Sequence, residues 1–447
     1  MDHLFNPDTF FTIPDAELLF LLRDAFAPEL ERLKNAYSVS DLNIARPSTP
    51  SPSRILYGVD YDEVNRTLVS VLALRWLHNS QYDQFVAGQP ESVRLTRESF
   101  AWMRQQVVEV PDDDLEALLT AVIINDLGKD ASLAADYHSR TGEDVSALNH
   151  DAILLKACLQ PGMVAALDRL SPLQRAGVMR GLELGAEFNY GQLAQTENAP
   201  ACLDVLRRFN GSGHDRRAVA LHFLEQLLDI SGAAGHMDWT SARKLIEPII
   251  QAYRVSHDVV TGILSGTLDS CAGYDLVLTR RADLLRHKGF RALDLGNAVD
   301  RALSRLMCMG GVADRPTADL YEAVWTSLDK LARQGLVRSL NLTGSATDPA
   351  VLPTYMPALL TQAADATNSS KPRSEKERGL YSALLYLARV MTLPSPQDRH
   401  YHGAIVVERN VLDVLKNVVQ SQAFREHPAI LERAEVPRGT GVVFGEA

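Results

Sequence analysis

The segment AELLFLLRDAFAPELERL, residues 16–33, carries the pattern that decides the fold. Its apolar side chains recur at spacings of three and four, which is the period of an amphipathic α-helix. Pro28 lacks a backbone donor and interrupts a helix that would otherwise run through it. We therefore expect helix over residues 15–36, kinked or split near Pro28.

The same period recurs along most of the chain. Strand-like alternation is scarce, with residues 404–407 and 441–444 as short exceptions. Because about a third of residues are helical in an average protein, this chain lies well above the norm. The sequence therefore predicts an all-α fold. The predicted helical segments are 61–88, 93–109, 112–128, 145–160, 171–187, 201–209, 215–231, 239–267, 272–288, 291–309, 315–335, 376–392 and 410–434.

Prolines mark the expected domain organisation. A Pro/Ser-rich loop near residues 44–54 separates an N-terminal arm from the body of a main helical domain, residues 1–341. Residues 342–378 contain several prolines, among them Pro353, Pro357 and Pro372, and the charge run 371–378, which predicts a surface excursion or linker. Residues 379–447 then form a C-terminal helical extension. Two helical subdomains joined near 340–375 are the alternative.

Composition excludes several classes of protein. Lys and Arg number 45 and Asp and Glu 56, so the net charge of −11 disfavours a protein coated in basic charge but permits a local basic patch. No run of about 20 apolar residues predicts a membrane span, and the N-terminus lacks a secretory signal pattern. We expect a cytoplasmic protein. Its scattered cysteines predict free thiols rather than a disulfide scaffold or zinc site: Cys158, Cys202, Cys271 and Cys308.

An acidic motif opens the predicted helix 112–128. Asp112 and Asp113 lie four and three residues before Glu116, so the three carboxylates share one face of a helix. Such a group can bind a metal ion, an ammonium group or a guanidinium, whose planar fork donates paired hydrogen bonds to a carboxylate. Acids in the first turn of a helix also complement its dipole, and this structural role is the alternative explanation.

A second motif, Asn125-Asp126-Leu127-Gly128-Lys129, ends the same helix. It resembles the His-Asp-x-Gly-Lys element of HD-domain metal hydrolases and inositol-oxygenase-like di-iron enzymes, with Asn125 in place of the metal-binding histidine. A helix from 112 to 126 spans roughly 20 Å at ~1.5 Å per residue, so we expect the two motifs to form separate sites. The remaining ligands of an HD-like site would be His78, His150, His222 and Asp229, with Asp126.

A basic segment, RRADLLRHKGFR, covers residues 280–291. Its five cations face one acid, which makes it locally basic on an acidic chain. Lys and Arg clusters of this kind contact nucleic-acid phosphates, although a solvated helix face is the simpler alternative. The predicted contacts are Arg280, Arg281, Arg286, Lys288 and Arg291.

An all-helical chain of this length with a DDxxE motif at Asp112, Asp113 and Glu116 resembles the arginine-containing cyclodipeptide synthases of filamentous fungi, in which a DDxxE motif is tied to activity. The resemblance implies a transferase that joins the aminoacyl groups of arginyl-tRNA and a second aminoacyl-tRNA into a cyclic dipeptide, a diketopiperazine of secondary metabolism. It implies Asp112, Asp113 and Glu116 as catalytic residues and requires no cofactor. The basic segment would bind tRNA, and no stable protein partner is expected.

Two other functions remain open from sequence. The first is an HD-like metal-dependent phosphohydrolase or di-iron oxygenase built on Asp126. The second is a non-enzymatic helical adaptor, because Walker, HExxH and GxSxG motifs are all missing from the sequence.

Overall fold

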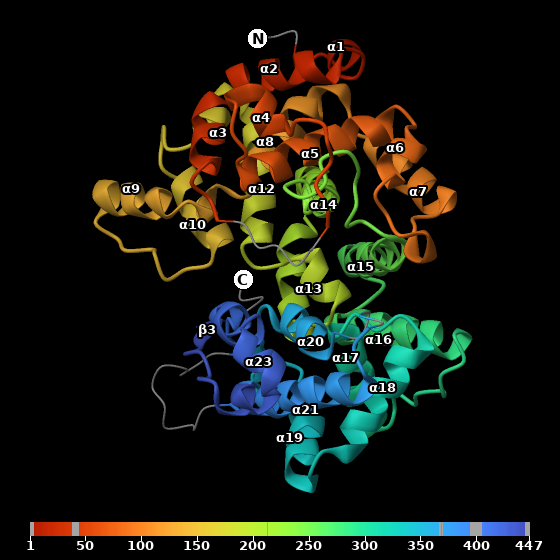
Figure 1. The fold of residues 1–447 in the computed structure, drawn as a ribbon. Helices are drawn as coiled ribbons and strands as arrows, with labels where there is room; N and C mark the ends of the chain where they lie inside the picture. The colour runs from red at the N-terminus through yellow and green to blue at the C-terminus, as the bar shows by residue number, and fades with distance from the viewer. Residues whose placement is uncertain are drawn as a thin grey trace. The chain divides into compact units, whose positions relative to one another are not determined.

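The computed structural model describes residues 4–37, 44–211, 213–365, 368, 370–393 and 405–442 (Figure 1). Helices dominate these residues, and three short strands form the only named sheet within them. The predicted all-α fold is confirmed. The chain divides into two compact units: unit 1 comprises residues 1–189 and 211–251, and unit 2 comprises residues 190–210 and 252–447.

Unit 1 contains α-helices joined by short 3₁₀ turns. Its helices are α1 (Pro7–Phe10), α2 (Asp15–Ala25), α3 (Ala27–Leu33), α4 (Pro52–Tyr57), α5 (Asp62–His78), α6 (Tyr82–Val86), α7 (Arg97–Val108), α8 (Leu115–Ile124), α9 (Ala131–Thr141), α10 (His150–Cys158), α11 (Ala165–Arg169), α12 (Pro172–Gly185) and α14 (Gly213–Gly232). Its 3₁₀ turns are η1 (Glu91–Val93), η2 (Asp112–Asp114) and η3 (Leu127–Lys129). Helix α15 (Glu247–Leu264) begins in unit 1 and continues into unit 2.

Helix α5 forms the centre of unit 1. From Glu63 to Leu77 every residue except Arg66 is buried, because α4, α6, α7, α8 and α14 pack around it. Its acidic first turn and basic last turn complement the helix dipole. Two of its charged residues, Glu63 and Arg66, therefore lie in or beside the core, where charges need partners.

The N-terminal arm splits where the sequence predicts. Helix α2 ends at Ala25, and α3 begins at Ala27 with Pro28 in its first turn. Proline is tolerated there because the first N–H groups of a helix have no intrahelical acceptor. The prediction of a break near Pro28 is confirmed.

Unit 2 combines helices with a small mixed sheet. Its helices are α13 (Tyr190–Ala194), α16 (Ser270–His287), α17 (Ala298–Met309), α18 (Arg315–Ser327), α19 (Lys330–Leu340), α20 (Met356–Ala364), α21 (Arg373–Val390), α22 (Leu412–Val414) and α23 (Gln422–Glu426). Unit 2 also contains the 3₁₀-helices η4 (Pro200–Phe209) and η7 (Pro428–Arg433) and the π-helix η6 (Leu415–Val419). The strands β1 (Ala350–Leu352), β2 (Val406–Glu408) and β3 (Thr440–Val442) pair in that order, β1–β2 parallel and β2–β3 antiparallel.

The structure corrects the predicted domain boundaries. Residues 342–378 are not a surface excursion, because β1 and most of α20 are buried in the core of unit 2. Pro357 lies in the first turn of α20, and Pro372 immediately precedes α21. Both prolines mark helix starts rather than an irregular loop. The two compact units are divided near residues 190, 210 and 251, whereas the sequence predicts divisions at 341 and 379.

Two smaller predictions can be compared directly. The four cysteines are free, as expected. Among the described residues, no helix is both long enough and apolar enough to cross a membrane.

Candidate functional site

The acidic motif forms a turn rather than a helix start. Asp112, Asp113 and Asp114 make up η2, and α8 begins only at Leu115. The side chains of Asp112 and Asp113 are exposed, whereas Glu116 is half-buried in the first turn of α8. The expected three-carboxylate face along one regular helix is therefore replaced by two exposed acids and one half-buried acid around a tight turn.

Asp114, a variable position of the DDxxE pattern, fastens this turn to the rest of unit 1. Its side chain is 1% exposed and accepts a hydrogen bond from Arg217 of α14. Gln174 of α12 donates to the Asp113 carbonyl over 2.5 Å. The same Gln174 side chain completes a capping box with Ser171, which fixes the start of α12. The turn Asp112–Asp114, which we call the acid turn, is thus held in place by α12 and α14.

A pocket of about 470 Å³ lies between the N-terminal ends of α12 and α14, beside this turn. Arg217 links the two features, because it lines the pocket and binds Asp114. Its lining combines apolar and small residues with charged ones. The lining residues are Pro172, Leu173, Ala176, Gly177, Arg180, His214, Asp215 and Arg217.

The second motif belongs to a cluster of buried charges beneath η3. The Lys129 ammonium lies 2.8 Å from both Glu63 Oε1 and Asp126 Oδ1. Arg66 Nη1 lies 3.2 Å from the other oxygen of Glu63. The Glu63 side chain also hydrogen-bonds to Asp126, and Asp229 of α14 interacts electrostatically with the same groups. Two cations thus lie among three carboxylates.

In this charge cluster (Glu63, Arg66, Asp126, Lys129 and Asp229), the pKa values of the three carboxyl groups shift in different directions. Burial, with the nearby charge of Asp126, raises the pKa of Glu63 to about 7. Burial works against ionisation of Asp126 too, but Lys129, the Glu63 hydrogen bond and Arg66 hold its pKa below the usual range. Burial and the Asp126 charge raise the pKa of Asp229. Below about pH 7, Glu63 is therefore the carboxyl that carries the proton and donates a hydrogen bond to Asp126.

Gly128 brings His150 to the edge of this cluster. A Cβ atom at residue 128 would lie 1.9 Å from the His150 carbonyl oxygen, so η3 and the start of α10 can approach only without a side chain there. His150 Nε2 then lies 4.0 Å from Asp126 Oδ1 and 3.4 Å from Asp151 Oδ1.

We expect Gly128→Ala to destabilise unit 1 by roughly 1–3 kcal/mol or more, because the added methyl meets backbone that cannot rotate away. Chemical denaturation followed by circular dichroism measures the change. Gly177→Ala is the matched control: its Cβ would meet only Leu221 at 3.6 Å, and alanine favours the helix. Equal stability of the two variants would contradict the close approach.

The structure does not assemble the HD-like metal set predicted from sequence. Asp126, His150 and Asp229 come together, but Lys129 and Arg66 lie among the carboxylates where a metal ion would bind. The His78 ring stacks on Phe11 at 3.5 Å between centroids, and His222 pairs with Glu225 at 3.2 Å. Within the described part of the chain, no three or more His, Cys, Asp or Glu side chains are arranged so that they could hold a metal ion together.

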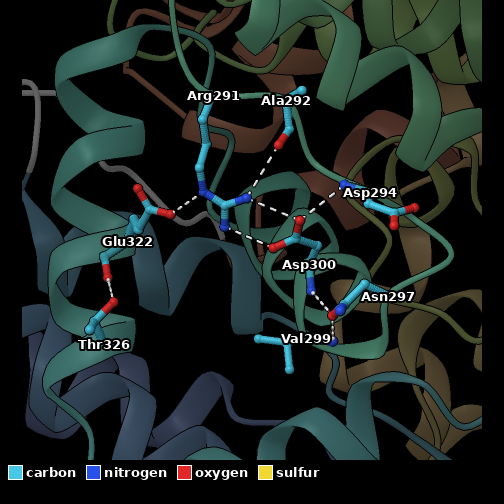
Figure 2. Close-up of polar contacts among 8 residues, drawn as sticks. All are labelled: Arg291, Ala292, Asp294, Asn297, Val299, Asp300, Glu322 and Thr326. Carbon is cyan, nitrogen blue, oxygen red and sulfur yellow. Dashed lines mark hydrogen bonds and ion pairs between the residues drawn. The ribbon is translucent and has the colours of Figure 1, made fainter.

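The basic segment is only partly available to a ligand. Figure 2 shows Arg291 bound bidentately to Asp300, at 3.0 and 2.8 Å, and also to Glu322. Arg281 donates to the Val312 carbonyl over 2.6 Å, and Arg286 pairs with Asp283 at 3.2 Å. Exposed cations remain at the C-terminal end of α16: Arg280, Arg286 and Lys288.

Sequence reasoning missed the acids and bases contributed by distant segments. Glu63 and Arg66 lie about 60 residues before Asp126. Their only sequence signal is the presence of charges in an otherwise apolar helical run. In unit 2, Glu197 is 5% exposed and accepts hydrogen bonds from the backbone N–H groups of Tyr355 and Met356, at the start of α20. Burial raises its pKa to about 8.

Comparison with known proteins identifies a family whose function is unknown. A family model described as "Family of unknown function (DUF6829)" matches residues 19–431. No curated protein and no solved structure matches the chain significantly. The matched region extends over both units and contains the acid turn, the pocket, the charge cluster and the basic segment. The chain therefore belongs to the DUF6829 family.

Proposed function

We propose that this protein is an arginine-containing cyclodipeptide synthase that uses arginyl-tRNA and a second aminoacyl-tRNA. The observation that carries the proposal is the acid turn: Asp112 and Asp113 present exposed carboxylates at a position fixed by the Asp114–Arg217 and Gln174–Asp113 contacts. Exposed acids on a fixed turn beside a pocket suit the recognition of a cationic substrate group.

Both substrate groups in this reaction are cationic. The guanidinium of an arginyl group binds carboxylates through paired hydrogen bonds. The α-ammonium must lose a proton before its nitrogen can attack, and a positioned carboxylate can accept that proton. Asp112 and Asp113 are the exposed members of the motif, so we assign substrate contact to them, with Glu116 behind them in α8.

The reaction balances without an added cofactor. The free amine of one aminoacyl group attacks the ester carbonyl of the other, the carbon–oxygen ester bond breaks, and the tRNA ribose hydroxyl takes up a proton. The dipeptidyl ester then cyclises in the same way. Two amide bonds form as two ester bonds break, and two free tRNA molecules leave. The energy comes from the aminoacyl esters, so neither ATP nor a redox partner takes part.

Arg280, Arg286 and Lys288 are the exposed cations of unit 2 that we propose for contact with tRNA phosphates. Such contacts supply affinity without reading sequence. Arg281 and Arg291 serve internal contacts instead, so the proposed phosphate contacts are fewer than the five predicted from sequence.

We expect cells expressing the protein to release an Arg-containing diketopiperazine, detected by mass spectrometry of the culture medium. Asp113→Ala should reduce this product at least tenfold, because it removes one of the two exposed carboxylates of the turn. The product mass identifies the second amino acid. Asp83→Asn is the matched control, since it removes an exposed carboxylate of unit 1, in α6, that pairs only with Arg97 among the contacts of the described residues.

The alternatives give different results in the same experiment. A product unaffected by Asp113→Ala would remove the acid turn from the mechanism. Folded protein that yields no diketopiperazine would overturn the proposal. Stoichiometric metal in the purified protein would then favour the HD-like enzyme, and a co-purifying macromolecule would favour the adaptor.

A further inference from the structure

The pocket between α12 and α14 combines features that suit a nucleoside. Pro172 and Leu173 line it with apolar surface, and Leu173 is 46% exposed although it is a large apolar side chain. Ala176 and Gly177, which line the pocket from α12, are small and leave space for a ligand. A volume of about 470 Å³ falls within the ~300–1,000 Å³ usual for small-molecule sites. A flat nucleobase can pack against this apolar surface.

The charged lining residues offer both hydrogen-bond donors and acceptors. Arg217 uses one N–H group to hold Asp114, and a guanidinium carries five. His214 is exposed at the start of α14, and the Asp215 carboxylate lies beside it. Arg180 pairs with Asp215 at 3.0 Å and with Glu183 at 2.7 Å, so the lining is close to electrically balanced. A balanced lining favours a ligand with hydroxyl and amine groups plus one phosphate over a highly charged ligand.

We infer that this pocket binds the 3′-terminal adenosine of an aminoacyl-tRNA. This inference rests on the proposed function and names the part of the substrate that the pocket holds. The aminoacyl ester is attached to the ribose of that adenosine, so a nucleoside held in the pocket leaves its aminoacyl group within a few bonds of the lining. The acid turn is fastened to that lining through Arg217, where Asp112 and Asp113 can meet the aminoacyl cation.

The test uses the full-length protein and the trinucleotide CCA, which carries the sequence of the tRNA 3′ end. Isothermal titration measures its binding to the wild type, to Ala176→Trp and to Leu173→Glu. Ala176 and Leu173 are exposed, so both variants are expected to fold. Ala176→Trp fills the pocket, and Leu173→Glu replaces part of its apolar lining with a negative charge. Each should weaken CCA binding at least tenfold. The trinucleotide UUU, with the same backbone charge, should bind the wild type more weakly than CCA.

Steady-state synthesis from purified arginyl-tRNA supplies the second measurement. The two variants should raise KM for the tRNA substrate more than they lower kcat, because they remove substrate binding and leave Asp112 and Asp113 in place. Asp83→Asn should change neither CCA binding nor KM.

The two proposals can fail separately. If the wild type makes a diketopiperazine and both pocket variants keep its KM and its CCA affinity, the pocket assignment is wrong and the synthase stands. If the wild type makes no product but binds CCA, and both pocket variants lose CCA binding, the synthase proposal is wrong and the nucleoside pocket stands. Equal binding of CCA and UUU would overturn the adenosine assignment.

Discussion

Replacing Lys129 with methionine is expected to destabilise unit 1 by about 3–5 kcal/mol, the usual cost of removing one partner from a buried ion pair. The Lys129 ammonium contacts Glu63 and Asp126 at 2.8 Å each, and its side chain is only 11% exposed. Methionine fills a similar volume but leaves these two carboxylates with Arg66 as their remaining close cation. Urea denaturation of the wild type and the variant at pH 7 measures the difference.

Lys156→Met is the matched control for this experiment. Lys156 also lies 2.7 Å from a glutamate, Glu143, but that pair is solvent-exposed. Exposed ion pairs contribute little to stability, so this variant should resemble the wild type. A second arm, Lys129→Met combined with Glu63→Gln, should recover part of the loss, because the pKa of Glu63 is about 7 and the substitution removes a carboxyl that is partly ionised at the pH of the experiment. A Lys129→Met variant as stable as the control would show that the charge cluster is not electrostatically coupled.

Glu197→Gln is expected to stabilise unit 2 at alkaline pH and to have little effect near pH 4.5. Burial raises the pKa of Glu197 to about 8 from an ordinary value of 4.5. Below pH 4.5 the folded and unfolded chains both hold this proton. Between pH 4.5 and 8 the unfolded chain releases it and the folded chain retains it, so stability falls as pH rises. Glutamine stays neutral and keeps an acceptor for the Tyr355 and Met356 N–H groups.

The free energy of unfolding of the variant relative to the wild type should therefore increase with pH, by at most about 1.4 kcal/mol per pH unit. Parallel denaturation series at pH 5, 6.5 and 8 measure it, and amide exchange in α20 locates it. Glu377→Gln, a half-buried acid of α21 paired with Arg373, should show no such trend. A constant difference between Glu197→Gln and the wild type across this range would mean that Glu197 is ionised in the folded protein.

The local periodicity of apolar residues was sufficient to predict most helices, but not which other segments those helices pack against. The break at Pro28 is a local effect, because the missing N–H acts within one turn. The strand-like segments 404–407 and 441–444 overlap β2 and β3, while β1 has three residues and no alternation of its own. Proline occurs both in loops and at helix starts, so the prolines between residues 342 and 378 do not separate the two cases, and only the buried partners of α20 distinguish them.

The candidate sites show the same limit. The sequence identifies Asp112, Asp113 and Asp126 as acids that stand out, but the contacts that decide their roles come from residues about 60 to more than 100 positions away. Asp114, a variable position in the motif, is the acid that the fold uses as an anchor. Lys129 belongs to the motif that resembles the HD-domain element, and only its contacts with Glu63 and the neighbouring Arg66 show that it completes a buried charge cluster. Pairings over such separations depend on tertiary packing.

The interleaved path of the chain has a consequence for its biosynthesis. Residues 190–210 leave the ribosome before unit 1 is complete at residue 251, yet they belong to unit 2. Their apolar side chains, including Leu203, Leu206 and Phe209, are fully buried in the finished protein. The rest of unit 2 begins only at residue 252, after the 41 residues 211–251, so at ~5–20 residues per second roughly two to eight seconds pass before the first of their later partners is made. During that interval the nascent chain exposes an apolar segment, and we expect chaperones that bind apolar segments to contact it at this stage of translation.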